Sequence, residues 1–157
     1  MQEKEKQFTE ALGQCRLSLY RVARVMLHSD ADAEDAVSMA TVAVWEHLSK
    51  IRSLDALPGY LMQCTVNACR KIYRQKSKEI AAEDLEALSP PPRGEETPVW
   101  IYISHLPEKF RLPLQLRYGE NFSLDDTAHI LRIPKGTVSS RCSRGLKLLK
   151  AQLTKEE

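Results

Sequence analysis

The chain has 157 residues, of which 43% are hydrophobic and 28% charged, and its formal net charge at pH 7 is +2. This length suits one domain or two small ones, with enough apolar material for one or two modest helical cores. No apolar run approaches the roughly 18–20 residues that a membrane-spanning helix needs, and the polar N-terminal segment lacks a signal-peptide core, so we expect a cytoplasmic protein without membrane insertion.

The first part of the chain is predicted to be helical. Apolar residues recur at steps of three and four from Phe8 to Met26, which is the spacing of one helix face. The polar segment His28–Asp32 interrupts this pattern, and Asp30 or Asp32 is expected to cap the next helix. The inner stripe of that second helix is predicted to be Val37, Thr41, Val44, Leu48 and Ile51.

A third helix is expected after a loop at Ser53–Pro58, because proline is favoured just inside a helix start. It should run to about Lys76 and bury Leu61, Thr65, Ala68 and Ile72, with Cys64 and Cys69 at the edges. On its opposite face, Gln63, Asn67, Arg70 and Arg74 recur at steps of four, three and four. Asparagine can bond a base edge and cations can hold phosphates, although an ordinary solvent-exposed helix can carry the same stripe.

The segment Glu79–Pro98 is predicted to be a linker. Residues 77–98 hold 2 Lys/Arg against 6 Asp/Glu, and three successive prolines occur at Pro90–Pro92. Such a sequence favours extended backbone, and about 20 residues at about 3.3 Å each could reach ~65 Å. The flanking residues 1–76 and 99–157 carry net charges of +2 and +4, so the acidic linker separates two mildly basic blocks.

The second block is again predicted to be helical. Pro107 suits a first helical turn, whereas Pro113 should kink or divide the segment Leu106–Tyr118. A turn at Gly119–Phe122 follows, and Ser123 with Asp126 resembles a capping box. Because no strand pattern, internal repeat or glycine-rich phosphate loop is visible, the predicted class is all-α: two small helical domains joined by a flexible linker.

The C-terminal residues are predicted to form a helix-turn-helix. A short helix, Leu124–Leu131, is followed by the turn Arg132–Pro134 and a helix over Lys135–Lys150, and Ala128 should allow the two helices to approach closely. The second helix should pack through Val138, Cys142, Gly145, Leu146 and Leu149. Its other face should present Gly136, Thr137, Ser140, Arg144 and Lys147, with Arg141 at the border.

Residues 132–150 contain six Lys/Arg and no acid, which favours a helix that enters the DNA major groove over a solvated lysine-rich surface helix. If about three of the cations meet phosphates, affinity should fall with a log–log salt slope of roughly −2.7.

The cysteines and histidines do not indicate catalysis or a metal. Cys15, Cys64, Cys69 and Cys142 lie at apolar helical positions and should be free thiols in packed interiors. The five-residue spacing of Cys64 and Cys69, with no histidine nearby, does not fit a zinc site. The four histidines are scattered and read as surface or capping residues.

Three stretches together resemble bacterial RNA polymerase sigma factors of the sigma-70 family, and of its small extracytoplasmic-function (ECF) class in particular. They are DAEDAVSMATVAVWEHLSKIR, LPGYLMQCTVNACRKIYRQK and LPEKFRLPLQLRYGENFSLDDTAHILRIPKGTVSSRCSRGLKLLK. The resemblance implies a region-2 domain over residues 1–78, a linker over 79–98 and a region-4 domain over 99–157. It also implies a protein that binds core RNA polymerase and directs promoter recognition, DNA melting and transcription initiation without a cofactor.

Individual roles follow from this resemblance alone. The surface that docks on the β′ clamp helices of the polymerase would include Asp35, Ser38 and Met39, and the β flap and an anti-sigma factor would be further partners. Residues for the minus-ten element would be Gln63, Asn67, Arg70, Lys71 and Arg74, with the loop Ser53–Pro58 as the other wall of a pocket for a flipped base. Residues for the minus-thirty-five element would be Thr137, Ser139, Ser140, Arg141, Ser143, Arg144 and Lys147.

The chain departs from the family pattern at several of these positions. Ser38-Met39 replaces a usual Gln-Glu pair, and Thr41 replaces a common Phe. Lys71 stands where an acid is frequent, and Arg132 replaces a turn glycine, with roughly 1 kcal/mol of strain expected if its φ is positive.

Two alternatives remain open from the residues. One is a polymerase-independent helix-turn-helix regulator, which would place a sensor or dimerisation face in the first block. The other is a recombinase or nuclease, which would need a nucleophile with a base or clustered carboxylates for a metal; we expect no enzyme because neither is visible.

Overall fold

The computed structural model describes residues 2–80 and 99–154, so most of the predicted linker, including Pro90–Pro92, lies outside the described residues. The secondary structure over these two ranges is helical and contains no strand, which confirms the all-α class. The chain forms two compact units, Met1–Tyr73 (unit 1) and Arg74–Glu157 (unit 2), and each is described by itself. The predicted boundaries at residues 78 and 98 stay predictions.

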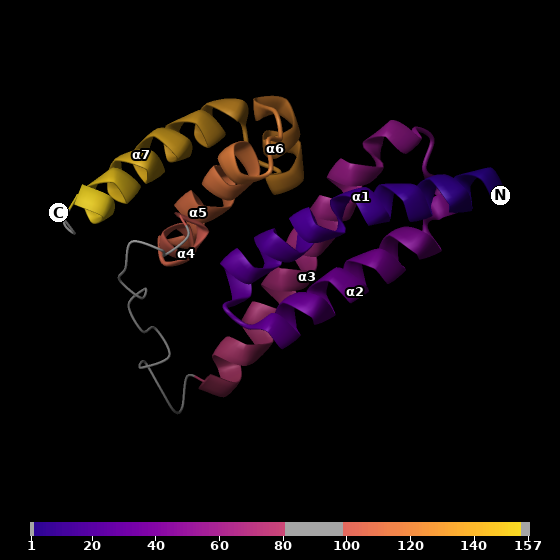
Figure 1. Ribbon diagram of the computed structural model, residues 1–157, viewed down its shortest axis with the longest axis horizontal. Coiled ribbons are helices and arrows are strands. Elements are labelled where there is room, and N and C mark those ends of the chain that lie inside the picture. The colour runs from indigo at the N-terminus through magenta and orange to yellow at the C-terminus, as the bar shows by residue number, and fades with distance from the viewer. Residues whose placement is uncertain (1, 81–98, 155–157) are drawn as a thin grey trace. The chain divides into compact units, whose positions relative to one another are not determined.

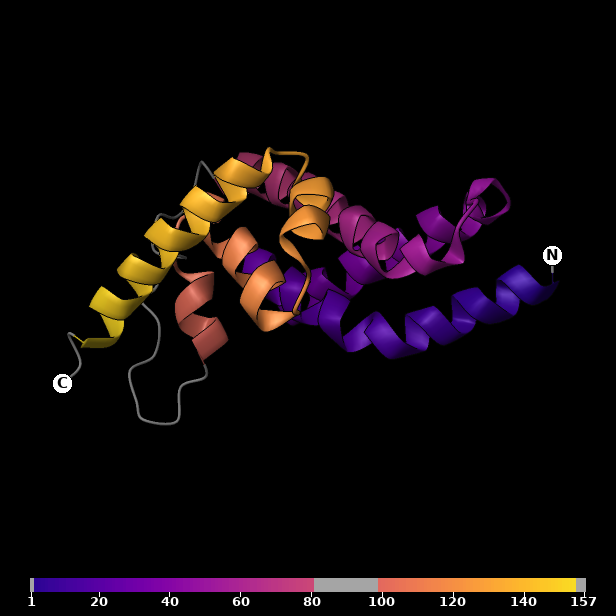
Figure 2. The same cartoon turned by 90° about the horizontal axis from the view of Figure 1, so that it is seen from above.

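Unit 1 consists of helices α1 (Gln2–Leu27), α2 (Asp30–Glu46) and most of α3 (Leu57–Ile80), which lie side by side (Figures 1 and 2). Short 3₁₀ turns at Leu48–Lys50 and Leu54–Ala56 connect α2 to α3. The second helix therefore ends before Leu48, contrary to the predicted stripe, although Leu48 is buried from the 3₁₀ turn. The third helix extends past the predicted end at Lys76.

The core of unit 1 combines large residues on α1 and α3 with small ones on α2. Leu19 and Val22 of α1 and Leu61 of α3 are fully buried. On α2, Ala33, Ala36 and Ala40 line the packed side next to Val37 and Val44. These alanines allow α1 and α2 to approach closely along their length, and the apolar periodicity that predicted the stripe did not include them.

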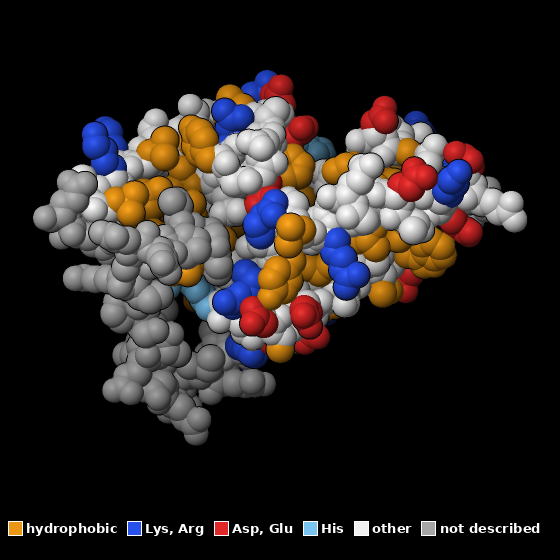
Figure 3. All heavy atoms as spheres, viewed as in Figure 1, with side chains coloured by type: hydrophobic (Ala, Val, Ile, Leu, Met, Phe, Trp, Pro, Cys, Tyr) orange, Lys and Arg blue, Asp and Glu red, His pale blue; other side chains and the backbone are white. Residues whose placement is uncertain are grey.

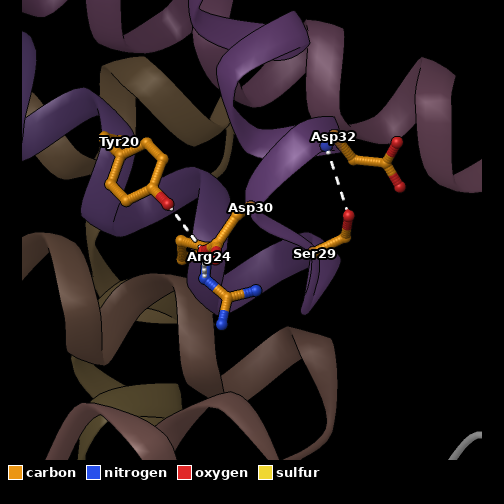
Figure 4. Close-up of polar contacts among 5 residues, drawn as sticks. All are labelled: Tyr20, Arg24, Ser29, Asp30 and Asp32. Atoms are coloured by element: carbon orange, nitrogen blue, oxygen red, sulfur yellow. Dashed lines mark hydrogen bonds and ion pairs between the residues drawn. The ribbon is translucent and has the colours of Figure 1, made fainter.

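The corner between α1 and α2 is fixed by a local polar network (Figure 4). Ser29 is in an extended conformation and its Oγ accepts a hydrogen bond from the Asp32 backbone N–H at 3.3 Å, so Ser29 is the N-cap and the prediction of Asp30 or Asp32 was wrong. Asp30 instead uses its Oδ1 to accept from the Tyr20 hydroxyl at 2.7 Å and to pair with Arg24 Nε at 2.9 Å. The hydrogen bond to the Asp30 carboxylate raises the pKa of Tyr20.

Unit 2 is built from the short helices α4 (Val99–Ser104), α5 (Glu108–Leu114) and α6 (Leu124–Leu131) and the longer α7 (Lys135–Thr154). Pro113 lies in the last turn of α5, and a π-helical turn, Gln115–Gly119, follows it directly. Because proline cannot donate its backbone hydrogen bond, the predicted division of Leu106–Tyr118 is confirmed.

Helix α7 packs on α5 and α6 (Figure 1). Val138, Cys142 and Leu149 are buried on its inner side, as predicted, and Gly145 lies beside them. A Cβ atom at Gly145 would come within 2.7 Å of Leu114 Cδ1 and 3.2 Å of Phe110 Cβ, so α5 and α7 leave no room for a larger residue here. Leu146 was predicted to pack but is 41% exposed, because it lies about 80° around the helix from Val138, at the edge of the stripe.

Candidate nucleic-acid interface

The turn between α6 and α7 has the backbone geometry of a tight helix-turn-helix. Ser123 caps α6, since its Oγ accepts from the Asp126 N–H at 3.0 Å, which confirms the predicted cap. At the other end, Arg132 is left-handed (φ 57°, ψ 45°), and the Ile133 N–H donates to the Ala128 carbonyl at 3.1 Å in a Schellman motif. An ion pair between Asp125 and Lys135 also links the first turns of the two helices.

Helix α7 has one side that packs against the rest of unit 2 and an opposite side that is polar. Thr137 and Arg141 are half-buried. The other residues predicted to read duplex DNA are exposed: Ser139, Ser140, Ser143, Arg144 and Lys147. Because Val138 and Cys142 point into the unit, the hydroxyl and guanidinium groups are left on the outside, where they can reach base edges and phosphates.

Helix α3 carries the second set of predicted residues on the face opposite its core. Asn67, Lys71 and Arg74 are exposed, whereas Gln63 and Arg70 are half-buried. The inner side of this helix is formed by Leu61, Met62, Thr65, Val66 and Cys69. Cys69 is thus fully buried rather than at an edge, and Ile72 is only half-buried.

The segment before α3 is tied to the N-terminal turn of α1. Lys4 Nζ donates to the carbonyl oxygens of Ser49 at 3.3 Å and Ile51 at 3.1 Å. These carbonyls lie at the end of the 3₁₀ turn, where helical partners are missing. The predicted pocket loop, Ser53–Pro58, therefore starts from a fixed point, and Pro58 is the second residue of α3.

An exposed face of α2 bears the residues predicted to dock on the polymerase. Asp35 and Ser38 are exposed and Met39 is 39% exposed. Two further apolar side chains, Val42 (55%) and Trp45 (47%), lie three and six residues after Met39, and the Trp45 ring packs 5.4 Å from the buried Phe8 ring. The spacing of Met39, Val42 and Trp45 in the sequence could have predicted this row of exposed apolar side chains.

Burial is the largest cause of the pKa shift at each of the four cysteines. Burial raises the pKa of the Cys69 thiol to about 12, and it also raises the pKa values of Cys15, Cys64 and Cys142. All four thiols are free, but Cys15 and Cys64 are only half-buried. Over residues 2–80 and 99–154, no group of three or more His, Cys, Asp or Glu side chains could hold a metal ion.

Charge on the helices of unit 1 is mixed: on the face shown in Figure 3, acidic and basic side chains are interspersed. Acid-free segments with several Lys or Arg residues include Arg70–Lys78 on α3 and Lys135–Lys150 on α7. None of the described helices has both the length and the hydropathy needed to cross a lipid bilayer.

The chain matches two family models, Sigma-70 region 2 over residues 13–79 and Sigma-70, region 4 over residues 102–151. It is 27% identical to RNA polymerase sigma factor SigV of Bacillus subtilis, with 98% of each chain covered. It is 29% identical to ECF RNA polymerase sigma factor SigM of Mycobacterium tuberculosis, over 80% of this chain and 66% of that protein.

Among solved structures, it is similar to the sigma factor RpoE of Bartonella quintana, whose structure is a complex with the anti-sigma factor NepR. The TM-score is 0.81 at 21% identity, and 97% of this chain and 99% of that chain are covered, so the two share a fold.

Proposed function

The chain belongs to the sigma-70 family of RNA polymerase sigma factors, in the ECF class, and we infer that it binds core RNA polymerase and directs it to promoters. This conclusion rests on one observation: each of the two family-model matches contains the basic segment of one of the two basic helices. The region-2 match contains the basic end of α3 and the region-4 match contains the helix-turn-helix. A polymerase-independent regulator is not favoured, because it would have no use for a region-2 domain.

We propose that α7 reads the minus-thirty-five element as intact duplex. Ser139, Ser140, Ser143 and Arg144 are exposed on one helix, and the major groove admits a single helix of this kind. Arginine reads guanine through two acceptors, whereas serine hydroxyls read several bases. The cations Arg141 and Lys147 would fix the position on phosphates, and Thr137 would contribute from the start of the helix.

We propose that α3 binds the melted minus-ten element. Extruding a base costs a few kcal/mol, which a small protein does not recover from its own contacts. Asn67, aided by Gln63, would hold a flipped base against the loop Ser53–Pro58, while Arg70, Lys71 and Arg74 follow the backbone. The minus-ten and minus-thirty-five elements lie about 80 Å apart at 3.4 Å per base pair, which is farther than either unit can span. A linker of about 20 residues, which can reach ~65 Å, suits this division.

Core polymerase would hold both units, with the β′ clamp helices on α2 and the β flap on region 4. Because Ser38 and Met39 replace the usual Gln-Glu pair, we propose that Val42 and Trp45 contribute apolar contact area on α2. The family consists of transcription factors, and we propose no enzymatic activity and a cytoplasmic location. RpoE is bound by an anti-sigma factor in its structure, and we propose an inhibitory partner of that kind here.

Two measurements test the function together. The purified chain should co-elute with core RNA polymerase, and the resulting holoenzyme should give run-off transcripts from members of a randomised promoter library. Core enzyme alone is the control. Absence of co-elution would remove the sigma-factor assignment, and DNA cleavage by the chain with added magnesium would contradict its non-enzymatic role.

A further inference from the structure

The first turn of α1 holds the entry to the loop that precedes α3. Lys4 lies in this turn, and its Nζ donates to the Ser49 carbonyl oxygen at 3.3 Å and to the Ile51 carbonyl oxygen at 3.1 Å. The two acceptors lie 45 and 47 residues later in the chain. Figure 1 shows the start of α1 beside the connection between α2 and α3. One ammonium group therefore joins α1 to the segment from which the loop begins.

A second contact, one helical turn further along α1, holds the end of α2. Lys4 and Phe8 are four residues apart and therefore lie on the same face of α1. Phe8 is buried, and the centre of its ring lies 5.4 Å from that of Trp45 in the last turn of α2. Helix α1 also contacts both 3₁₀ turns of the connection. The start of α1 thus holds the connection at its beginning through Phe8 and at the entry of the loop through Lys4.

Lys4 does not stabilise the helix that carries it. The N-terminal end of a helix favours acidic side chains, such as Glu3 and Glu5 in this turn, and disfavours a cation. The carbonyl groups of Ser49 and Ile51 have the opposite character, because they lie at the C-terminal end of the 3₁₀ turn Leu48–Lys50, where acceptors lack helical partners. The position of this cation is therefore explained by the segment that it holds.

The loop after this segment is held at both ends and exposed between them. At its entry the Ile51 carbonyl accepts from Lys4, and at its exit Leu57, the first residue of α3, is buried. The residues between these ends include four that are exposed: Arg52, Ser53, Asp55 and Ala56. Within the loop, the Ala56 N–H donates to the Ser53 carbonyl at 3.3 Å, which is a long and therefore weak bond. The conformation of the exposed residues thus depends on the two ends, and loss of Lys4 would release one of them.

We propose that Lys4 is a positioning residue for base selection in the minus-ten element. By holding the entry of the loop, it keeps Ser53–Pro58 in one conformation, so the wall of the pocket opposite Asn67 is formed before the base arrives. This inference rests on the proposed function of α3, and it adds a residue of α1 that acts through the loop and not on DNA. A preformed wall rejects bases of the wrong shape, whereas a mobile wall adapts to several bases. The loss of Lys4 should therefore reduce discrimination between bases more than it reduces overall binding.

The test uses the full chain in holoenzyme with core polymerase. Run-off transcription rates are measured on a promoter selected by that holoenzyme from the randomised library, and on derivatives with one base changed at each position of the two elements. The ratio of the two rates gives the discrimination at each position. Asn67→Ala identifies the captured base, because it should lose discrimination at that position. Lys4→Met keeps the apolar stem and removes the donors, and we expect it to reduce discrimination several-fold at the same position and to leave the minus-thirty-five element unaffected.

Two variants and a second measurement separate this role from a general loss of stability. Lys6→Met removes an exposed cation of α1 two residues later and should leave discrimination unchanged. Lys4→Arg keeps donors at the same place and should retain most of the discrimination. In hydrogen exchange, Lys4→Met should speed exchange several-fold at the amides of Lys50, Ile51 and Ala56, each of which donates a hydrogen bond within the connection. Protection in the cores of α2 and α3 should stay at the wild-type level.

Three results would overturn the inference. Unchanged exchange over residues 48–57 in Lys4→Met would show that the lysine does not hold the loop. Faster exchange with wild-type discrimination would show that the loop does not select the base, and an equal loss of discrimination at every position of both elements would show a general defect. A wild-type holoenzyme without preference for the selected promoter, or an Asn67→Ala holoenzyme that keeps discrimination at every minus-ten position, would instead overturn the proposed function of α3.

Discussion

The two basic helices of this chain, α3 and α7, lie in units that are built differently. Helix α3 is 24 residues long and carries its cations toward its C-terminal end. The core of unit 1, to which α3 contributes, is built from long, continuous helices. Helix α7 carries Arg141 and Arg144 after a three-residue turn, and the unit around it consists of short helices broken by Pro113. The polar groups differ as well, since α3 presents the amides Gln63 and Asn67 where α7 presents hydroxyls and guanidiniums.

Under the proposed function, this difference suits the two helices to two states of DNA. A duplex has a fixed groove, so its reader must be held at a defined angle, and the left-handed Arg132 and the α6 contact provide that angle. An unpaired base can move toward the protein, so α3 needs an exposed amide and a row of cations more than it needs a tight corner. If the two units are independent in this way, each should depend on its own packing.

The largest effect is expected in the core of unit 1. Leu19→Ala removes a fully buried side chain and should cost about 2–5 kcal/mol, because the cavity it leaves cannot collapse completely. Hydrogen exchange, measured peptide by peptide, should show lost protection in α1 and α2 and none lost in α5 to α7. Equal loss in both units would mean that they fold as one.

The corresponding test of core packing in unit 2 is Gly145→Ala. The new Cβ would lie 2.7 Å from Leu114 Cδ1, and Leu114 is itself 1% exposed and cannot move freely. We expect a loss of about 1–3 kcal/mol in urea denaturation, although alanine favours helix formation. Gly13→Ala is the control, because a Cβ there meets nothing within 4 Å, and it should stabilise α1 slightly. A stabilised Gly145→Ala protein would show that α5 and α7 do not pack this closely.

A gain of stability is expected at the turn. Arg132→Gly removes the cost of a left-handed φ from a residue with a side chain and should add about 0.5–1 kcal/mol. This should raise the melting temperature of unit 2 by several degrees. Asn121→Gly is a matched control, since its φ is 62° but asparagine tolerates this conformation, so its gain should be smaller. If Arg132→Gly lowers the melting temperature, the turn is not strained.

The smallest effect concerns the α1–α2 corner. The bond from the Tyr20 hydroxyl to Asp30 favours the protonated phenol and raises the pKa of Tyr20 above its ordinary value of about 10. The corner bond is therefore fully present below that pH and is lost as the pH rises through the raised pKa. In an NMR titration, Asp30→Asn should lower the pKa of Tyr20 and leave the other four tyrosines unchanged. An unchanged Tyr20 titration would remove Asp30 as the cause.

Local chemistry in the sequence predicted more of unit 2 than of unit 1. Ser123, Pro113 and the bounds of the turn at Arg132–Pro134 follow from residues with strong local preferences, and all three are confirmed. The cap of α2 was mispredicted because Ser29, Asp30 and Asp32 can all cap a helix, and only the extended backbone of Ser29 selects it. Periodicity also misplaced Leu146, since it marks the direction of a side chain and not whether another element covers it.

At the candidate site, too, sequence periodicity predicts the direction of a side chain but not its contacts with distant elements. The outward direction of Asn67 and Arg144 follows from helical spacing, and the structure places both on exposed faces. The hollow lined by Lys109, Gly136 and Arg144 could not be predicted, because it brings Lys109 against residues 27 or more positions later in the chain. Contacts of that range depend on how α5 packs on α7, which no local pattern encodes.

The central claim is that α3 and α7 bind different states of promoter DNA. It is tested most directly by holoenzymes carrying Asn67→Ala or Arg144→Ala on one selected promoter. Two quantities are measured for each, the affinity for the upstream duplex and the permanganate reactivity of unpaired thymines in the minus-ten element. Asn67→Ala should lower thymine reactivity about tenfold and keep duplex affinity, as expected for the loss of about 1–2 kcal/mol from a base contact. Arg144→Ala should weaken duplex affinity by a similar factor and leave reactivity unchanged at saturating holoenzyme. If the two variants lower both quantities in parallel, α3 and α7 do not divide the promoter between them.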